Sequence, residues 1–349
     1  MITHREPSRS ANETVLAVEK LTVEIEVPAG QLHAVTEVDL HVDRGETLCI
    51  VGESGCGKTM TALGIMGLLP RRARMRAQRL ALEGRDLLAM RRAELGALRG
   101  DRMAMIFQDP MTSLNPVYTV GNQMEEIYVR HGKGGHKEAR ERAEYLLHKV
   151  GITAASQRLA QYPHQLSGGL RQRVMIAMVL MCDPILMIAD EPTTALDVTI
   201  QAQILHLLAD LQQEYRMALI LITHDLGVVA RMADRVIVMY AGQVVETGTA
   251  AKIFAAPTHP YTRGLLDCIP IPGKTRRGAK LGSIPGIVPS LIGQLDGCQF
   301  RNRCAHAFAA CGAGPIALRS LASDHAYRCL LEQTPKRENR QQQPAGAPP

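Results

Sequence analysis

The stretch GESGCGKT at residues 52–59 constrains the fold more than any other part of the chain. It fits the pattern GxxxxGK[ST], follows the apolar segment ETLCIV at 46–51 and precedes the helix-like segment MTALGIMGLL at 60–69. In such a loop the glycines let the backbone close around phosphate, while successive amides at a helix N-terminus supply positive potential. The sequence therefore predicts a phosphate-binding loop between a buried strand and a helix.

The residues of this loop have separate expected roles. Lys58 is expected to reach the β- and γ-phosphates of a nucleotide, and the Thr59 hydroxyl is expected to ligate Mg²⁺. The other residues expected to contact the nucleotide are Gly52, Ser54, Gly55, Cys56, Gly57 and Met60. A glycine-rich turn without function is the alternative, and the flanking strand and helix argue against it.

The segment ILMIADEP at 185–192 supplies two carboxylates at the end of a predicted buried strand. Asp190 is expected to hold Mg²⁺, and Glu191, which points differently, is expected to orient or deprotonate an attacking water. Phosphoryl transfer requires mainly positioning of the reactants and neutralisation of their charge, and these groups are of the type that can provide both. A helix-capping role for the pair is the alternative, and the presence of the phosphate loop makes it the weaker one.

The segment LSGGLRQR at 166–173 predicts a second anion site. Ser167 is a good N-cap, and two glycines and an apolar, basic helix follow it. Because one ATP site does not need two such helix ends, we interpret this one as serving the ATP of a second subunit, arranged head to tail.

The fold class follows from alternating strand and helix patterns. Short apolar strands are predicted at 185–192 and 218–225, a hairpin at 235–248, and an amphipathic helix at 136–151. Together with an alternating strand at 21–27, they indicate an α/β core with a mostly parallel sheet.

Six motifs stand in the order found in ATP-binding cassette ATPases: the phosphate loop, Gln108 in MIFQDP, LSGG, ILMIADE, ALD at 195–197 and His224 in LITHD. The chain resembles that family over these motifs. The resemblance implies a P-loop NTPase core with an antiparallel β subdomain and a helical subdomain, and it implies ATP and Mg²⁺ as ligands.

The resemblance also implies roles for individual residues. Gln108 would contact the metal and the water and sense the membrane partner, and His224 would touch the γ-phosphate beside the catalytic Glu191. Four residues would act at the dimer seam. Ser167 and Gly169, with Gly168 between them, would clamp the γ-phosphate of the opposite subunit, and Asp197 would lie at the seam. The chain departs from the family in two places, having Leu170 after LSGG and no aromatic residue for adenine near Leu32 and His33.

Longer stretches resemble the ATPase subunits of bacterial oligopeptide and dipeptide permeases. They include FQDPMTSLNPVYTVGNQ at 107–123, ADEPTTALDVTIQAQIL at 189–205 and HPYTRGLL at 259–266. The resemblance is greatest to the first of the two ATPase subunits of a dipeptide permease. It implies an importer with a second, paralogous ATPase, two membrane permease subunits and an extracytoplasmic peptide-binding protein, with this chain at the cytoplasmic face of the membrane. Nickel permeases share much of the sequence, so nickel or another small solute is the alternative cargo.

Two domains and a C-terminal tail are expected along the chain. Residues 14–257 would form the nucleotide-binding domain, with a helical subdomain at about 112–182. Residues 258–332 would form a small Cys-rich accessory domain of the peptide-permease type, and 333–349 a disordered tail.

Four cysteines near the end of the chain have the spacing C-x5-C-x6-C-x17-C, at Cys298, Cys304, Cys311 and Cys329. Zinc sites usually have paired C-x2–4-C knuckles, which this spacing lacks, whereas Cys₄ ligation of a [4Fe–4S] cluster tolerates variable spacing. A [4Fe–4S] cluster is therefore favoured, zinc is the second choice and free thiols the third. Similar peptide-permease subunits carry this arrangement, and the resemblance implies a cluster there. We expect its role to be structural, because a segment of about 35 residues cannot bury enough surface to fold alone.

Composition argues against other classes of function. Aromatic residues make up 3% of the chain, Trp is absent, and the net charge of +6 accompanies no nucleic-acid motif. The start of the chain has no signal-peptide pattern, and the longest apolar runs are about half of a membrane span, so we expect a cytosolic chain. A soluble cassette ATPase acting on nucleic acid and a regulatory protein with a dead site are the alternatives; the single phosphate loop and the intact motif residues argue against them.

Overall fold

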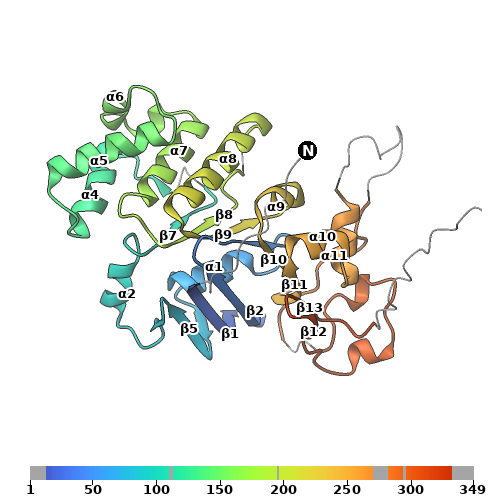
Figure 1. The fold of residues 1–349 in the computed structure, drawn as a ribbon. Coiled ribbons are helices and arrows are strands. Elements are labelled where there is room, and N and C mark those ends of the chain that lie inside the picture. Colours follow the sequence, from blue (N-terminus) through green and yellow to red (C-terminus); the bar gives the residue numbers. More distant parts are fainter. Residues whose placement is uncertain (1–12, 110–112, 195, 270–281, 294–295, 332–349) are drawn as a thin grey trace, which may run out of the picture.

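The computed structural model describes residues 13–109, 113–194, 196–269, 282–293 and 296–331. Figure 1 shows two sheets, a group of helices above them and a C-terminal region beside them. The predicted tail at 333–349 and the start of the helical subdomain at 112 lie outside the described residues.

The first sheet is antiparallel and has the strand order β2-β1-β5-β6, with β4 paired to β1. Its strands are β1 (Thr14–Val27), β2 (Gly30–Asp43), β4 (Ala73–Arg76), β5 (Arg79–Leu82) and β6 (Arg85–Asp86). The strand predicted at 21–27 is only the second half of β1. A register shift between Val18 and Leu21, with Lys20 at a φ of 54°, lets the strand continue across the polar pair that interrupts the alternation.

The second sheet has the order β12-β13-β11-β10-β3-β9-β8-β7. Its strands are β3 (Thr47–Val51), β7 (Met103–Ile106), β8 (Leu186–Asp190), β9 (Ala218–Thr223), β10 (Arg235–Tyr240), β11 (Gln243–Thr249), β12 (Arg319–Ala322) and β13 (His325–Tyr327). The five strands from β10 to β7 are parallel, and β3, β8 and β9 are buried along their whole length, as apolar runs in a covered parallel sheet should be. The predicted hairpin is confirmed as β10 and β11.

Helices cover this sheet and form a separate group at one side (Figure 1). They are α1 (Lys58–Met66), α2 (Arg92–Leu98), α4 (Val120–Arg130), α5 (His136–Lys149), α6 (Ala155–Leu159), α7 (Gly168–Val179), α8 (Val198–Tyr215), α9 (Leu226–Met232), α10 (Ala250–Ala255) and α11 (Pro260–Asp267). The amphipathic helix predicted at 136–151 is confirmed as α5. The helix predicted at 60–69 begins two residues earlier and ends at Gly67, which caps it in the left-handed region at a φ of 63°.

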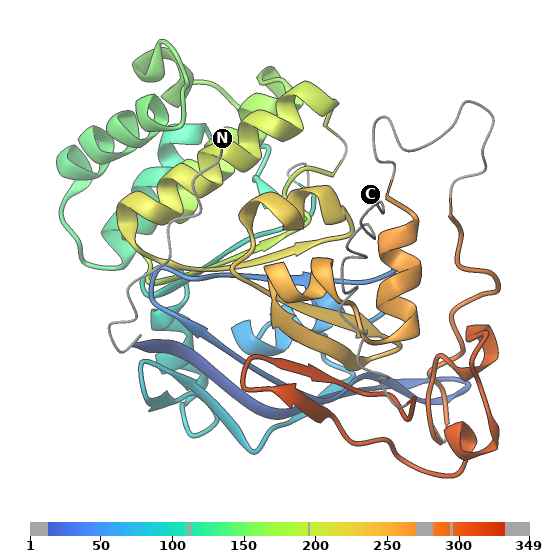
Figure 2. The same cartoon turned by 45° about the vertical axis from the view of Figure 1, so that its right-hand side comes forward.

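The C-terminal region packs directly on the main sheet. Strand β13 pairs with β11, and the β12–β13 hairpin, drawn in red, lies in the lower middle of the molecule in Figure 2. Leu291 and Phe300 belong to the same hydrophobic core as the parallel strands. The short turns η2 (Arg301–Arg303) and η3 (Ala309–Gly312) complete this region.

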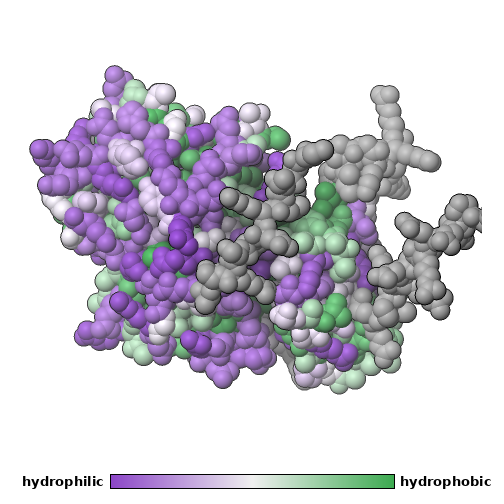
Figure 3. Space-filling view, in the orientation of Figure 1, coloured by the Kyte–Doolittle hydropathy of each residue, from purple (hydrophilic) through white to green (hydrophobic). Residues whose placement is uncertain are grey.

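In the space-filling view the surface of the helical group is mainly hydrophilic (Figure 3). Within the described ranges, every helix is too short or too polar to cross a membrane.

Candidate active site

The phosphate loop joins β3 to α1 and requires glycine at two points. Gly52 has a φ of 151°, and a Cβ there would lie 2.2 Å from the carbonyl oxygen of Met239. Gly57 has a φ of 100°, and a Cβ there would lie 2.4 Å from the carbonyl oxygen of Ala34. At these two points the loop lies against neighbouring backbone with no room for a side chain.

A cavity of about 240 Å³ lies over this loop and the start of α1. The residues from the predicted set that line it are Ser54, Gly55, Gly57, Lys58, Thr59, Met60, Gln108 and Glu191. The Cys56 side chain is buried under the loop instead, 3.8 Å from Lys58 Nζ, and burial raises the pKa of its thiol. The structure thus brings most of the residues expected at the nucleotide to one cavity.

Lys58 is held by the loop itself. Its Nζ donates to the carbonyl oxygens of Gly52 at 2.8 Å and Glu53 at 2.9 Å, and the residue is 5% exposed. These bonds fix the ammonium group beside the cavity. A buried ammonium group in this position can supply positive charge to a bound anion.

Asp190 and Thr59 form the part of the site that fits a magnesium ion. Asp190 ends β8 and is 2% exposed, yet its buried Oδ1 has no hydrogen-bond partner among the residues that the structure describes. Burial raises the pKa of this carboxyl group, while a hydrogen bond from Thr59 opposes that shift. An unpaired, buried carboxylate oxygen beside a hydroxyl is a donor set that Mg²⁺ prefers.

Side chains from distant parts of the chain contact the Glu191 carboxylate. Its Oε2 lies 3.4 Å from Gln108 Nε2, 3.4 Å from His224 Nδ1 and 2.9 Å from the Thr194 hydroxyl. Glu191 has a φ of 45°, which is a strained backbone conformation of a kind that persists mainly at functional sites. Its amide donates to the Ile222 carbonyl at 2.9 Å, which holds the residue in that conformation.

The residues expected at a dimer seam lie apart from this cavity. Ser167 caps α7 by accepting from the Leu170 amide at 3.4 Å, and Asp197 caps α8 by accepting from the Ile200 amide at 3.0 Å. The two helix starts are neighbours, since a Cβ at Gly169 would lie 3.1 Å from Ile200 Cγ2. Ser167 and Gly168 are exposed.

The other end of the cavity is apolar and includes a residue that the sequence analysis missed. It is lined by Ile25, Leu32, Ala34 and Leu291. The chain around Leu291 runs beside β2, because the His33 amide donates to the Leu291 carbonyl at 2.8 Å and the Gly293 amide donates to the Gln31 carbonyl at 3.0 Å. Leu291 lies in a Gly- and Pro-rich stretch with no periodicity, so no local signal pointed to it.

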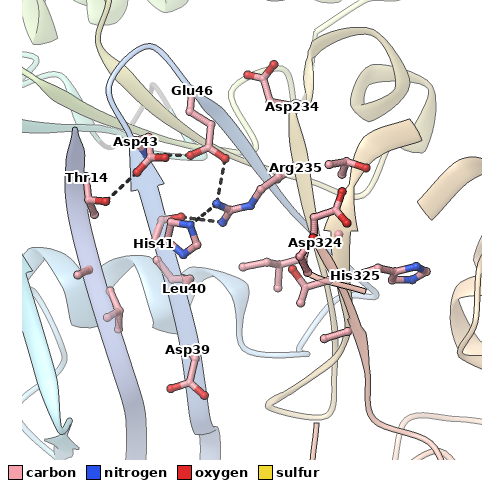
Figure 4. Close-up of a pocket in the computed structure, with 18 of the residues that line it drawn as sticks. Thr14, Asp39, Leu40, His41, Asp43, Glu46, Asp234, Arg235, Asp324 and His325 are labelled. Carbon is pink, nitrogen blue, oxygen red and sulfur yellow. Dashed lines mark hydrogen bonds and ion pairs between the residues drawn. The ribbon is translucent and has the colours of Figure 1, made fainter. Parts of the chain in front are cut away.

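A larger cavity, about 1130 Å³, lies elsewhere in the described part of the chain. It is a groove between the ends of β1 and β2 and the β10–β13 strands, shown in Figure 4. Its polar groups pair with one another: Arg235 contacts Glu46 at 3.2 Å and the His41 carbonyl at 2.8 Å, and the Thr14 hydroxyl donates to Asp43 at 2.9 Å. None of the predicted catalytic or nucleotide-binding residues lines it.

The four C-terminal cysteines line one small cavity together with His259 and Phe300. The cavity volume is about 10 Å³, which is at the lower limit of what a single water molecule needs. Burial raises the pKa of the Cys298 and Cys304 thiols, which favours the protonated form. Over the described residues, no group of three or more His, Cys, Asp or Glu side chains is close enough to hold a metal ion. Phe300 beside this cavity is buried, whereas Phe308 is 47% exposed.

Fold and site together define an ATP-binding cassette. The family model described as ABC transporter matches residues 35–194, and the model described as the C-terminal region of oligopeptide/dipeptide transporters matches residues 245–311. The chain is 50% identical over 315 residues to the dipeptide transport ATP-binding protein DppD of Escherichia coli, covering 90% of this chain and 96% of that protein. It is 47% identical over 321 residues to DppD of Bacillus subtilis, covering 92% and 95%.

A solved structure of the dimeric cassette MJ0796, bound to ADP and Pi after hydrolysis, has a TM-score of 0.60 at 26% identity, covering 67% of this chain and 98% of that chain. The chain belongs to the ABC transporter family and, within it, to the ATP-binding proteins of oligopeptide/dipeptide transporters. It is an ATPase of that class, so the expectation of an ATP-hydrolysing transport subunit is confirmed.

Proposed function

We propose that this chain hydrolyses ATP at Glu191 to drive the uptake of dipeptides and oligopeptides across the cytoplasmic membrane. The observation that carries the proposal is the convergence of Gln108, His224 and Thr194 on the Glu191 carboxylate, at the edge of the cavity over the phosphate loop. A carboxylate held from three sides can orient a water molecule and accept its proton.

The phosphates would be bound by Lys58 and by the amides of the loop at the start of α1. Thr59 and Asp190 would hold Mg²⁺, since the hydroxyl and the unpaired Asp190 oxygen fit that ion. Mg²⁺, when bound, neutralises charge on the phosphates. Glu191 would align the attacking water, while Gln108 and His224 would hold its carboxylate and contact the γ-phosphate region.

The base of the nucleotide would occupy the apolar end of the cavity. Leu32 and Leu291 take the place of the aromatic residue that the sequence lacks near residue 33. Aliphatic side chains bury a base by hydrophobic contact without stacking. We therefore expect the base to contribute less to affinity than the phosphates do.

Ser167, Gly168 and Gly169 would bind the γ-phosphate held by a second cassette, and Asp197 would lie at the seam between the two. The exposure of Ser167 and Gly168 and their separation from this chain's own cavity support this arrangement. The second cassette would be a paralogous subunit. Two permease subunits and an extracytoplasmic peptide-binding protein would complete the importer, with this chain at the cytoplasmic face.

Purification of the assembled transporter complex, followed by an ATPase assay, tests this proposal. The tagged chain, expressed with the neighbouring permease and ATPase genes, should purify in detergent as a complex whose ATPase activity is stimulated by the peptide-loaded binding protein. Purification of the chain alone, or stimulation by nickel rather than by dipeptide, would contradict the assignment.

We further propose that residues 14–257 act as the nucleotide-binding domain and residues 258–332 as a C-terminal unit stapled by a metal centre at Cys298, Cys304, Cys311 and Cys329. A shared cavity lined by four thiols supports the donor set, although its walls would have to separate to admit a [4Fe–4S] cluster. Anaerobically purified chain should be brown and hold about four iron per chain, as Cys₄ ligation implies. Colourless protein with one zinc would contradict the cluster.

A further inference from the structure

Arg303, in the turn η2 between two of the cysteines, reaches the phosphate loop. Its Nη1 donates to Glu53 Oε2 at 2.6 Å and its Nη2 donates to Glu53 Oε1 at 2.9 Å. The Arg303 side chain is 4% exposed and that of Glu53 is 28% exposed. A bidentate pair of this kind fixes both direction and distance, and it is stronger than an exposed ion pair.

Glu53 is the loop residue that this pair positions, and each of its polar groups has a partner. Its amide donates to the Tyr261 hydroxyl at 2.9 Å, and its carbonyl accepts from Lys58 Nζ at 2.9 Å. Tyr261 lies in α11, so two separate C-terminal segments hold Glu53. The phosphate-binding lysine is thus bonded to a residue whose position is set from outside the loop.

Arg303 is itself held firmly. Its Nε donates to the Pro285 carbonyl at 2.9 Å and its Nη2 donates to the Ile284 carbonyl at 3.1 Å. The guanidinium carbon lies 5.8 Å from the centroid of the Tyr240 ring and 6.0 Å from that of Phe300. The two carbonyls, the Glu53 carboxylate and the two rings together surround the guanidinium group. The Arg303–Glu53 ion pair therefore has little freedom to move.

We propose that Arg303 is a positioning residue for the nucleotide site, which acts through Glu53 to set the place of Lys58 and thereby the affinity for ATP. This inference rests on the proposed phosphate-binding role of the loop. It makes the C-terminal region, including the segment that carries Cys298 and Cys304, a determinant of nucleotide binding as well as of stability. A rearrangement of that segment would be transmitted to the phosphate loop through the Arg303–Glu53 ion pair.

Four variants of the full-length chain test the proposal: Arg303→Met, Glu53→Gln, the double variant and the control Arg328→Met. Arg328 also anchors the C-terminal region, donating to the carbonyls of Val244 at 2.9 Å and Ile316 at 2.6 Å, but it does not contact the loop. The measurements are the Kd of MgATP by titration calorimetry and the Tm without nucleotide. If Arg303→Met does not fold, Glu53→Gln tests the pair from the loop side.

Arg303→Met and Glu53→Gln should each raise the Kd by about tenfold, the cost of one hydrogen bond to a charged group. The Kd of the double variant should be no higher than that of the more severe single variant, because the two substitutions remove the same interaction. Arg328→Met should lower the Tm and leave the Kd within about twofold. The proposal is overturned if Arg303→Met lowers the Tm but leaves the Kd unchanged, or if Arg328→Met raises the Kd equally. Wild-type chain that binds no ATP would overturn the proposed function as well.

Discussion

Gln108 Nε2 and Glu191 Oε2 lie 3.4 Å apart although 83 positions separate the two residues in the chain. The same oxygen lies 3.4 Å from His224 Nδ1. The ends of β7, β8 and β9 bring these side chains together, because parallel strands present their carboxyl ends at one edge of the sheet. Positioning of a single carboxylate is therefore the shared task of three segments.

Replacing Gln108 with alanine should lower kcat for ATP hydrolysis by about tenfold or more in the assembled complex, because it removes the proposed contact of its amide with the metal and the attacking water in addition to one hydrogen bond to Glu191. The KM for ATP should change little. Thr194→Val is the matched control, since Thr194 bonds to the same oxygen at 2.9 Å but is not expected to contact the phosphates. Equal losses in both variants would mean that Gln108 only holds Glu191 in place.

Truncating Leu291 to alanine should weaken ATP binding by roughly three- to tenfold, because the base loses buried apolar contact worth about 1 kcal/mol. Ile287→Ala in the same segment is the control, since that side chain is 87% exposed. Fluorescence titration with a labelled ATP analogue measures the Kd of both variants. An unchanged Kd for Leu291→Ala would show that the base lies elsewhere.

A methyl group at Gly57 should destabilise the chain more than one at Gly55. Both glycines have positive φ, 100° and 77°, so alanine costs about 1–2 kcal/mol at either position. Only at Gly57 would the Cβ also collide with the Ala34 carbonyl; at Gly55 nothing described lies within 4 Å of it. Urea unfolding without nucleotide should therefore give a smaller free energy of unfolding for Gly57→Ala. Equal values would argue that the loop can move away from β2.

Cys304→Ser should abolish metal binding and lower the Tm of anaerobically purified chain, because a metal centre contributes its binding free energy to folding. Cys268→Ser is the control, since Cys268 is half-buried but does not line the cysteine cavity. Iron and zinc content and thermal unfolding are the readouts. Identical metal content and Tm in both variants would exclude a shared centre.

The sequence predicted the phosphate loop, the Asp190–Glu191 strand end and the Ser167 cap because each is a contiguous pattern with a local physical cause. Leu291 and Arg303 could not be predicted in the same way. Arg303 and its partner Glu53 are 250 positions apart, and both C-terminal residues lie in segments without periodicity. Their roles depend on β13 pairing with β11 and on two backbone hydrogen bonds to β2, which no local pattern encodes.

Hydrolysis by the Glu191→Gln variant in the assembled complex tests the central claim most directly. Glutamine keeps the shape of the side chain but cannot accept a proton, so turnover should fall by at least about a hundredfold, as for loss of a general base. The variant should still bind ATP and retain it unhydrolysed at the cassette dimer. Turnover equal to that of the wild-type complex would contradict the assignment of Glu191, and with it the account of how this chain uses ATP.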